Sequence, residues 1–361
     1  MSLKAIALQN YRTYAKASAE LSGINVLIGA NTQGKTNFLE AISYLTFGKS
    51  FRSSDRDLIK WGEDFFRIEA TTSENKKIEV FYSLNPQKKM VRIDNQAKKQ
   101  SELFGHNLAV LFSPEDINLI AAPPEKKRRY LDMIISQVDK LYLVDLISYK
   151  KILKQRNSLL LRIREGSGGT KELEVWSEKL VERGLPLIQK RHEFFIDFEE
   201  DLKKAYRNFG EQDLWLKFVS STPNSKEGFE AALKKAEATD IVSAKTSLGP
   251  HRDDFVFYLE DKEIESIGSR GEFRSAVLAL KLAEIKYLEK KTGKKAIFLL
   301  DDVFSELDES RRDALYNLIG DYQTIITSTD LDHLSEELLK KAAIFKIENY
   351  EIINQEIGNR K

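Results

Sequence analysis

The sequence predicts an α/β fold that is interrupted by a mostly helical insertion. Short apolar runs typical of buried strands lie near both ends of the chain, at residues 24–28, 108–112, 296–300 and 324–328. Between residues 123 and 240, apolar residues recur instead at helical spacing. We therefore expect a discontinuous α/β domain formed by residues 1–122 and 241–361, with a helical arm at residues 123–240.

The composition is that of a globular protein without bulk charge. The chain has 361 residues, and its 57 Lys and Arg nearly balance 56 Asp and Glu, which leaves a formal net charge of +1. Any affinity for nucleic acid must therefore come from local patches. The absence of Cys excludes disulfides, thiolate metal sites and Cys nucleophiles. No apolar run approaches the ~18 residues of a membrane-spanning helix, and the first residues lack the apolar core of a signal peptide. We expect a cytoplasmic protein with no membrane partner.

The first 120 residues are predicted to form strands around one helix. Phe38, Ala41, Ile42 and Leu45 follow the first apolar run at positions i, i+3, i+4 and i+7, which is the stripe of an amphipathic helix. Alternation of residue types over 78–84 indicates an antiparallel strand. The predicted architecture is a mixed sheet with an antiparallel β subdomain.

A phosphate-binding loop lies between the first buried strand and this helix. The pattern G-x-x-x-x-G-K-[ST] is formed by Gly29, Ala30, Asn31, Thr32, Gln33, Gly34, Lys35 and Thr36. Its glycines let backbone N–H groups point at phosphate oxygens, and the helix N-terminus adds partial positive charge. Lys35 supplies a cation for the β- and γ-phosphates, so we also predict a catalytic role for it, and Thr36 supplies a hydroxyl ligand for Mg²⁺. The sequence predicts these eight residues as nucleotide contacts.

Two carboxylates end the apolar run that begins at Ile297. In a P-loop fold the first of them, Asp301, lies near Mg²⁺, and the second, Asp302, is suited to deprotonate an attacking water. The structural alternative is a strand end with two solvated acids. Because the phosphate-binding loop is present, we favour an ATPase site with Asp301 as a nucleotide and metal contact and Asp302 as the catalytic base.

A third motif opens the helix predicted at residues 275–288. Ser269 and Glu272 fit the S-x-x-E capping box, which would be purely structural. The alternative is an ABC signature, in which Ser269 and Gly271 contact the γ-phosphate bound by a second subunit. The signature lies shortly before the acidic strand, and a Ser-Glu-Leu-Asp string follows that strand, so we favour the second interpretation.

A basic stretch begins the helical arm. Residues 126–164 contain eleven basic and three acidic residues, whereas residues 165–240 carry a net charge of −4. Most charged runs are solvated helix faces, but this asymmetry favours phosphate contacts, which need Lys and Arg without base-reading geometry. We predict DNA contacts by Lys126, Lys127, Arg128 and Arg129. No base-reading motif is present, so we expect little sequence preference.

Six strings in the sequence resemble those of a known family. They are LQNYR at residues 8–12, the phosphate-binding loop, FGKSFR at 47–52, SPED at 113–116, GPHRDD at 249–254 and LLDDVFSELD at 299–308. In this order they resemble the RecF family of the ABC/SMC-like ATPase group, and the match spans almost the whole chain. The resemblance implies an ABC-type P-loop ATPase head with ATP and Mg²⁺ as cofactors.

The resemblance also implies a function. Members of this family form homodimers on ATP, bind DNA at gaps or junctions, and act with RecR and RecO to help load the recombinase in recombinational repair and at replication forks. Weak and slow ATP hydrolysis, stimulated by DNA, would reset the dimer. In SMC-like heads an arginine placed like Arg52 links DNA to the nucleotide, so Arg52 joins the predicted DNA contacts. Glu272 departs from the S-x-G-Q signature of the family, and we interpret His251 in GPHRDD as structural.

Two other functions remain open from the residues alone. A P-loop phosphotransferase acting on a small molecule would need no Ser269. The ATPase subunit of a transporter is disfavoured by the long basic insertion.

Overall fold

The computed structural model describes residues 2–355, which belong to two compact units. The first unit combines Met1–Ile117 with Val277–Lys361, and the second is Asn118–Ala276. The insertion therefore extends beyond the predicted arm of residues 123–240. The reason is a strand pairing: β10 (Asp254–Leu259) is hydrogen-bonded to β9 (Leu214–Val219), which lies inside the insertion. Residues after 240 consequently belong to the second unit.

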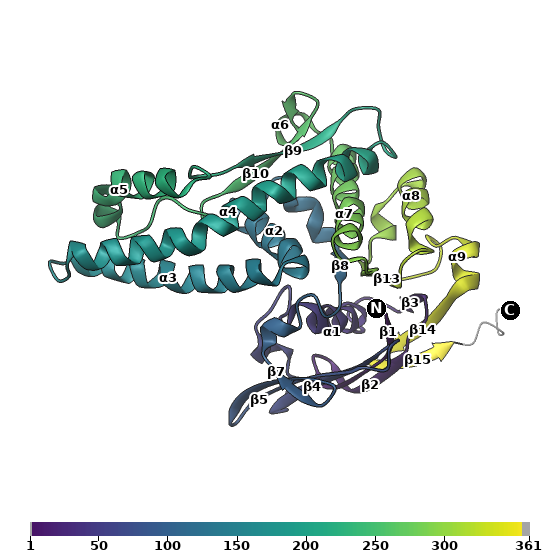
Figure 1. Cartoon of the computed structure of the whole chain (residues 1–361). Helices are drawn as coiled ribbons and strands as arrows, with labels where there is room; N and C mark the ends of the chain where they lie inside the picture. Colours follow the sequence, from purple (N-terminus) through teal and green to yellow (C-terminus); the bar gives the residue numbers. More distant parts are fainter. Residues whose placement is uncertain (1, 356–361) are drawn as a thin grey trace. The chain divides into compact units, whose positions relative to one another are not determined.

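A mixed sheet forms the centre of the first unit (Figure 1). Its order is β15-β14-β3-β13-β12-β8. The strands are β3 (Ile24–Ile28), β8 (Ala109–Phe112), β12 (Ile297–Asp301), β13 (Thr324–Ser328), β14 (Ala342–Glu348) and β15 (Glu351–Gln355). All neighbours pair in parallel except β14 and β15. The four predicted apolar runs are therefore adjacent parallel strands, and the α/β fold with a mixed sheet is confirmed.

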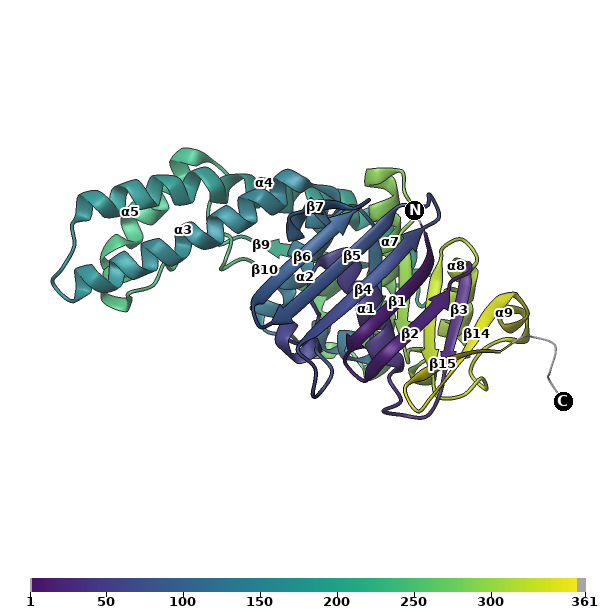
Figure 2. The same ribbon diagram turned by 90° about the horizontal axis from the view of Figure 1, so that it is seen from below.

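An antiparallel sheet of order β2-β1-β4-β5-β6-β7 forms the predicted β subdomain (Figure 2). Its strands are β1 (Leu3–Tyr11), β2 (Tyr14–Glu20), β4 (Phe65–Thr72), β5 (Lys77–Leu84), β6 (Gln87–Ile93) and β7 (Gln96–Lys98). The alternation in β5 places Ile78, Val80 and Tyr82 on the buried face. One face of the sheet is thus apolar and packs against the interior of the first unit.

Helix α1 (Lys35–Phe47) contacts strands of both sheets of the first unit. Because it is covered on more than one side, nearly every residue from Phe38 to Phe47 is buried, including the acidic Glu40. The remaining helices of this unit are α8 (Glu309–Ile319), α9 (Glu336–Lys341) and the part of α7 (Arg270–Thr292) that follows Ala276. Short 3₁₀ helices are η1 (Asp55–Leu58), η2 (Gln100–Glu102) and η4 (Phe304–Glu306), and η3 (Pro114–Leu119) spans the first division between the units.

A long antiparallel helix pair dominates the second unit, where α3 and α4 lie side by side (Figures 1 and 2). The helices are α2 (Pro124–Val138), α3 (Lys140–Arg164), α4 (Thr170–Tyr206), α5 (Lys226–Ser243) and α6 (Ile264–Ile267), and β11 (Lys262–Glu263) pairs with β10. The turn between α3 and α4 uses Gly166 and Gly168 at φ values of 81° and 134°, which favour glycine. A single long helix, α4, follows this turn and continues to Tyr206.

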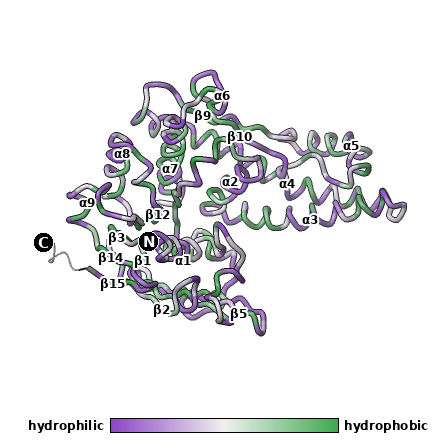
Figure 3. The backbone as a smooth tube through the Cα atoms, turned by 180° about the vertical axis from the view of Figure 1, so that it is seen from behind, coloured by the Kyte–Doolittle hydropathy of each residue, from purple (hydrophilic) through white to green (hydrophobic). Residues whose placement is uncertain are grey.

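The end of this helix pair has an apolar core of its own. Leu159, Leu160 and Leu173 are fully buried, and Trp176 and Ile241 pack against them. In Figure 3 the tubes of α3 and α4 change repeatedly between purple and green, as expected for helices with one buried and one solvated face.

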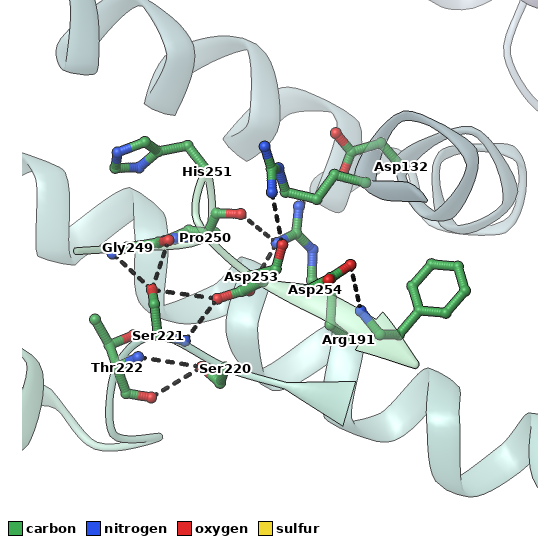
Figure 4. A network of polar contacts seen from close by, with 12 residues as sticks. Asp132, Arg191, Ser220, Ser221, Thr222, Gly249, Pro250, His251, Asp253 and Asp254 are labelled. Atoms are coloured by element: carbon green, nitrogen blue, oxygen red, sulfur yellow. Dashed lines mark hydrogen bonds and ion pairs between the residues drawn. The ribbon is translucent and has the colours of Figure 1, made fainter. Parts of the chain in front are cut away.

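Arg191 of α4 is a buried charged residue that lies outside this apolar core. Its guanidinium forms ion pairs with Asp132 of α2 at 2.8 Å and with Asp253 at 2.7 Å. It also donates to the carbonyl of Pro250 at 2.6 Å and to the hydroxyl of Tyr142. Asp253 in turn accepts from the backbone N–H of Ser221 (Figure 4). One arginine therefore joins α2, α3, α4 and the GPHRDD segment.

His251 is a neutral structural residue, as interpreted from the sequence. The Tyr149 hydroxyl donates to Nδ1 at 2.7 Å, and Nε2 donates to the carbonyl of Thr246 at 3.0 Å. Burial lowers the pKa of His251 to about 4, and the positive charges of Arg252 and Arg128 act in the same direction. Protonation would place a second N–H against the Tyr149 hydroxyl.

The lowered pKa of His251 predicts that the stability of the second unit depends on pH. Between pH 6.5 and about 4 the unfolded imidazole binds a proton and the folded one does not. The free energy of unfolding should therefore fall by up to about 3 kcal/mol as the pH falls through this range. Denaturant melts of the wild type and of His251→Gln should show a shallower pH slope for the variant. Parallel slopes would contradict this interpretation of His251.

Candidate functional site

The phosphate-binding loop occupies residues 29–34, between β3 and α1. Gly34 adopts φ 108°, and a Cβ there would lie 2.9 Å from the Tyr14 hydroxyl, which donates to the Gly34 carbonyl at 2.9 Å. Gly29 lies against the carbonyl of Ile347 in β14, where a Cβ would clash with it. Both glycines are therefore required by the fold of the loop.

Lys35 occupies the centre of the loop. Its Nζ donates to the carbonyls of Gly29 at 2.5 Å and Ala30 at 3.0 Å. Burial lowers its pKa, and the negative charges of Asp302 and Asp301 oppose this effect. The side chain is thus held inside the loop, with two carboxylates close enough to act on its charge.

Three hydrogen bonds connect Thr36, at the start of α1, and the ends of β12 and β13 with one another. The Thr36 hydroxyl donates to Asp301 Oδ1 at 2.9 Å, and the Thr327 hydroxyl donates to the same oxygen at 2.7 Å. The backbone N–H of Asp302 donates to the Thr327 hydroxyl at 2.9 Å. The order β3-β13-β12 explains this meeting, because the carboxyl ends of parallel strands lie at one edge of a sheet. The structure thus brings together Lys35, Thr36, Asp301 and Asp302, as the sequence predicted.

Asp302 is held in an unusual conformation with a free acceptor. Its φ is 52°, a left-handed value that a non-glycine residue seldom adopts. Its Oδ1 is buried and has no hydrogen-bond partner within the described part of the chain. Burial raises the pKa of Asp302; the cation of Lys35 opposes this and the charge of Asp301 reinforces it. A carboxylate with a raised pKa and an unused oxygen is suited to accept a proton from water.

The oxygen donors at this site fit Mg²⁺. The Thr36 hydroxyl and the Asp301 carboxylate are hard ligands, and Mg²⁺ in nucleotide sites takes one or two such protein ligands, with phosphates and waters completing its shell. Within residues 2–355 no cluster of three or more His, Asp or Glu side chains is arranged to hold a metal ion. Thr36 and Asp301 are thus the two residues that would hold a Mg²⁺ ion brought by a nucleotide.

A cavity of about 200 Å³ lies at the phosphate-binding loop, and Asp301, Asp302 and Arg52 contribute to its wall. Arg52 also belongs to an ion cluster around the buried Glu40. Its guanidinium pairs with Glu40 at 3.0 Å and donates to Asn37 Oδ1 at 2.6 Å. Arg12 of the LQNYR string donates to both carboxylate oxygens of Glu40. Burial raises the pKa of Glu40, but hydrogen bonds from Arg12, Arg52 and Ser50 outweigh it and hold the pKa below its usual value. Glu40 is thus a buried carboxylate that positions Arg52 at the cavity.

Glu40 was missed by the sequence analysis. It lies off the apolar stripe of α1 and is therefore typical of a solvated position. The available signal was composition, because Glu40 is the sole charged residue between Lys35 and Lys49.

Ser269 and Glu272 form the capping box. The Ser269 backbone N–H donates to Glu272 Oε2 at 2.7 Å, and the Glu272 N–H donates to the Ser269 hydroxyl at 3.2 Å. These bonds lower the pKa of Glu272. The carboxylate is therefore turned toward its own helix start, and Ser269 itself is exposed.

Only some residues of the basic stretch are exposed to solvent. Lys126 and Arg129 are exposed, whereas Lys127 is buried and Arg128 is half-buried with a 2.7 Å bond to the carbonyl of Asp253. Arg156, further along α3, is buried and paired with Asp240 at 2.8 Å. One face of α2 therefore packs into the unit, and of the four residues predicted to contact phosphate, Lys126 and Arg129 are the exposed ones. The phosphate contacts themselves stay a prediction.

No helix of residues 2–355 has the length and apolar character needed to cross a membrane.

Comparisons with known proteins show the family of this chain. The model of the RecF/RecN/SMC N-terminal domain matches residues 2–352. The DNA replication and repair protein RecF of Thermoanaerobacter pseudethanolicus is 38% identical over 368 residues, which cover 98% of this chain and all of the relative. Its counterpart in Bacillus cereus is 36% identical over 365 residues, 97% of either chain.

Solved structures give the same result. The recombination mediator protein RecF with ATP, of the RecFOR pathway, has a TM-score of 0.91 and 34% identity, and the match covers 98% of both chains. An Smc head domain with an extended coiled coil, from Pyrococcus furiosus, has a TM-score of 0.55 at 14% identity and shares the fold. The sequence match covers nearly the full length of the chain, and the fold is shared with the solved relative. This chain therefore belongs to the RecF family.

Proposed function

We propose that this chain is an ATP-hydrolysing, DNA-binding protein of DNA replication and recombinational repair. The observation that carries the proposal is the meeting of Lys35 and Thr36 with Asp301 and Asp302 at one edge of the mixed sheet. It is supported by the names of the relatives, which describe DNA replication and repair, and by the ATP in a solved relative. A cytoplasmic location is part of the same proposal.

ATP and Mg²⁺ are the proposed cofactors. The backbone of residues 29–34 holds the phosphates, and Lys35 exchanges its carbonyl partners for phosphate oxygens. Thr36 and Asp301 would hold Mg²⁺, which would supply positive charge against the charge that develops on the phosphates. Asp302 orients a water through its unpaired oxygen and takes the proton of that water.

Dimerisation on ATP would complete the site. We propose that Ser269 and Gly271 of one chain contact the γ-phosphate held by a second copy. The capping box leaves Ser269 exposed and keeps the Glu272 carboxylate on its own helix start. The acid that departs from the family signature is thereby prevented from facing a phosphate. Slow, weakly DNA-stimulated hydrolysis would separate the dimer again.

DNA is proposed as the partner of the exposed cations. Lys126 and Arg129 remain candidates for phosphate contacts in the second unit, and Arg52 remains one beside the nucleotide cavity. Contacts of this kind recognise DNA at gaps or junctions by its backbone, with little sequence preference. RecR and RecO, and the loading of a recombinase, complete the proposal, supported by the RecFOR pathway named for the solved relative.

Asp302→Asn and Lys35→Ala separate binding from hydrolysis. Asp302→Asn should bind ATP within about threefold of the wild type and lose hydrolysis by at least about 100-fold, because the amide cannot take a proton. It should accumulate as an ATP-bound dimer in sedimentation experiments. Lys35→Ala should lose both binding and dimerisation, and Lys16→Ala, on the exposed side of β2, serves as the control. Normal turnover by Asp302→Asn would move the catalytic base elsewhere.

The salt dependence of DNA binding tests the two exposed cations of α2. In the double variant Lys126→Ala/Arg129→Ala, each lost phosphate contact should reduce the log–log salt slope for duplex DNA by ~0.9, and both together by ~1.8. DNA-free ATP hydrolysis should not change. The matched control is Lys340→Ala/Lys341→Ala, which removes two exposed cations from α9. If the α2 variant keeps the wild-type slope, these residues do not contact DNA.

A further inference from the structure

The middle of the phosphate-binding loop has an unfavourable backbone conformation. Thr32 adopts φ 69°, a left-handed value that a β-branched residue seldom takes. Its hydroxyl donates to the Asn31 carbonyl at 2.5 Å, and Thr32 is exposed, so packing of its side chain does not enforce this conformation. A backbone of this kind persists only where the surrounding contacts fix it. The contacts on either side of Thr32 must therefore hold the loop in shape.

The start and the end of the loop are fixed by neighbouring strands. The Gly29 N–H donates to the carbonyl of Ser328, the last residue of β13, at 3.4 Å, and Gly29 also lies against the Ile347 carbonyl of β14. The Tyr14 hydroxyl, at the start of β2, donates to the Gly34 carbonyl at 2.9 Å. Between these two points, the side chain of Gln33 leaves the loop and contacts a further element.

Gln33 is hydrogen-bonded to the turn between β14 and β15. Its Oε1 accepts from the Asn349 N–H at 2.9 Å. Glu348 and Glu351 are the last pair of the two strands. The two residues between them, Asn349 and Tyr350, have positive φ values of 52° and 63°, as a type I′ turn requires. The pairing of β14 with β15 thus fixes the position of the donor, and the donor fixes the Gln33 amide.

The elements that hold Gln33 and Gly34 also contact each other. β15, which begins directly after the turn, contacts β2, the strand that begins at Tyr14. Two consecutive residues of the loop are therefore held by a pair of elements in mutual contact. This arrangement gives the loop a fixed support on the side that follows Thr32.

We propose that Gln33 is a positioning residue, whose side chain holds the phosphate-binding loop in the conformation that binds the diphosphate part of a nucleotide. This inference rests on the proposed function, in which the backbone of residues 29–34 holds the phosphates, and it assigns the Gln33 side chain to the β14–β15 turn. ATP and ADP share these phosphates. A preformed loop therefore raises the affinity for both nucleotides by the same factor and does not change the rate of hydrolysis.

Gln33→Met tests this role, because methionine has a similar length and no oxygen acceptor. The dissociation constants of ATP and ADP, both measured with Mg²⁺, should rise together about tenfold, while single-turnover hydrolysis stays within about twofold of the wild type. Gln87→Met is the matched control, since Gln87 is exposed and bonded to Tyr82 in the hairpin of β5 and β6, and it should change neither quantity. Unchanged ADP affinity in Gln33→Met, or a loss confined to the hydrolysis rate, would overturn the proposal and leave the proposed function intact.

A second substitution separates positioning from a general loss of stability. Thr32→Gly removes the cost of the left-handed φ, because glycine adopts positive φ freely. Added to Gln33→Met, it should bring the ADP affinity back to within about threefold of the wild type. Absence of this rescue would overturn the proposal, and so would a lowered thermal denaturation midpoint of nucleotide-free Gln33→Met, which would make the residue merely structural. A wild type that binds neither ATP nor ADP would overturn the proposed function as well.

Discussion

The hydroxyl of Thr327 holds the two acidic residues of the candidate site in one arrangement. It donates to the Asp301 carboxylate and accepts from the Asp302 N–H, while the Thr36 hydroxyl approaches Asp301 from the phosphate-binding loop. These contacts exist because β13 lies between β3, which leads into the phosphate-binding loop, and β12, which ends at Asp301. Thr327 of β13 is therefore next to both acidic residues. Asp302 has a left-handed backbone, and within residues 2–355 its buried Oδ1 has no hydrogen-bond partner. The chemistry proposed for the site needs this free oxygen.

Buried ions organise each unit in the same physical way. Glu40 is fully buried in α1 and is compensated by Arg12 and Arg52, and Arg191 is buried in α4 and compensated by Asp132 and Asp253. A buried charge without its partners is strongly destabilising, so each cluster fixes the segments that supply those partners. In the first unit the cluster places Arg52 at the nucleotide cavity. In the second it fixes the GPHRDD segment through Asp253 and the carbonyl of Pro250.

The sequence predicted the features that depend on local patterns. We could predict the phosphate-binding loop, the acidic strand end and the apolar parallel strands. The reason is that loop glycines and continuous apolar runs can be recognised in the sequence itself. The second unit extends past residue 240 because β10 pairs with β9, and pairing between distant strands leaves no local signal. Lys127 and Arg156 were counted as surface cations because charge alone does not reveal which helix face is buried. Glu40 was missed for the converse reason, since its burial depends on two sheets packing on α1.

The most direct test of this account concerns the Thr327 hydroxyl. Thr327→Val keeps the shape of the side chain and removes the bond to each acidic residue, and Thr327→Ser keeps the hydroxyl and serves as the control. ATP affinity and single-turnover hydrolysis should be measured for both. The account predicts that Thr327→Val binds ATP within about threefold of the wild type and hydrolyses it about tenfold more slowly or worse, while Thr327→Ser remains close to the wild type. Unchanged hydrolysis by Thr327→Val would show that this hydroxyl does not organise the site.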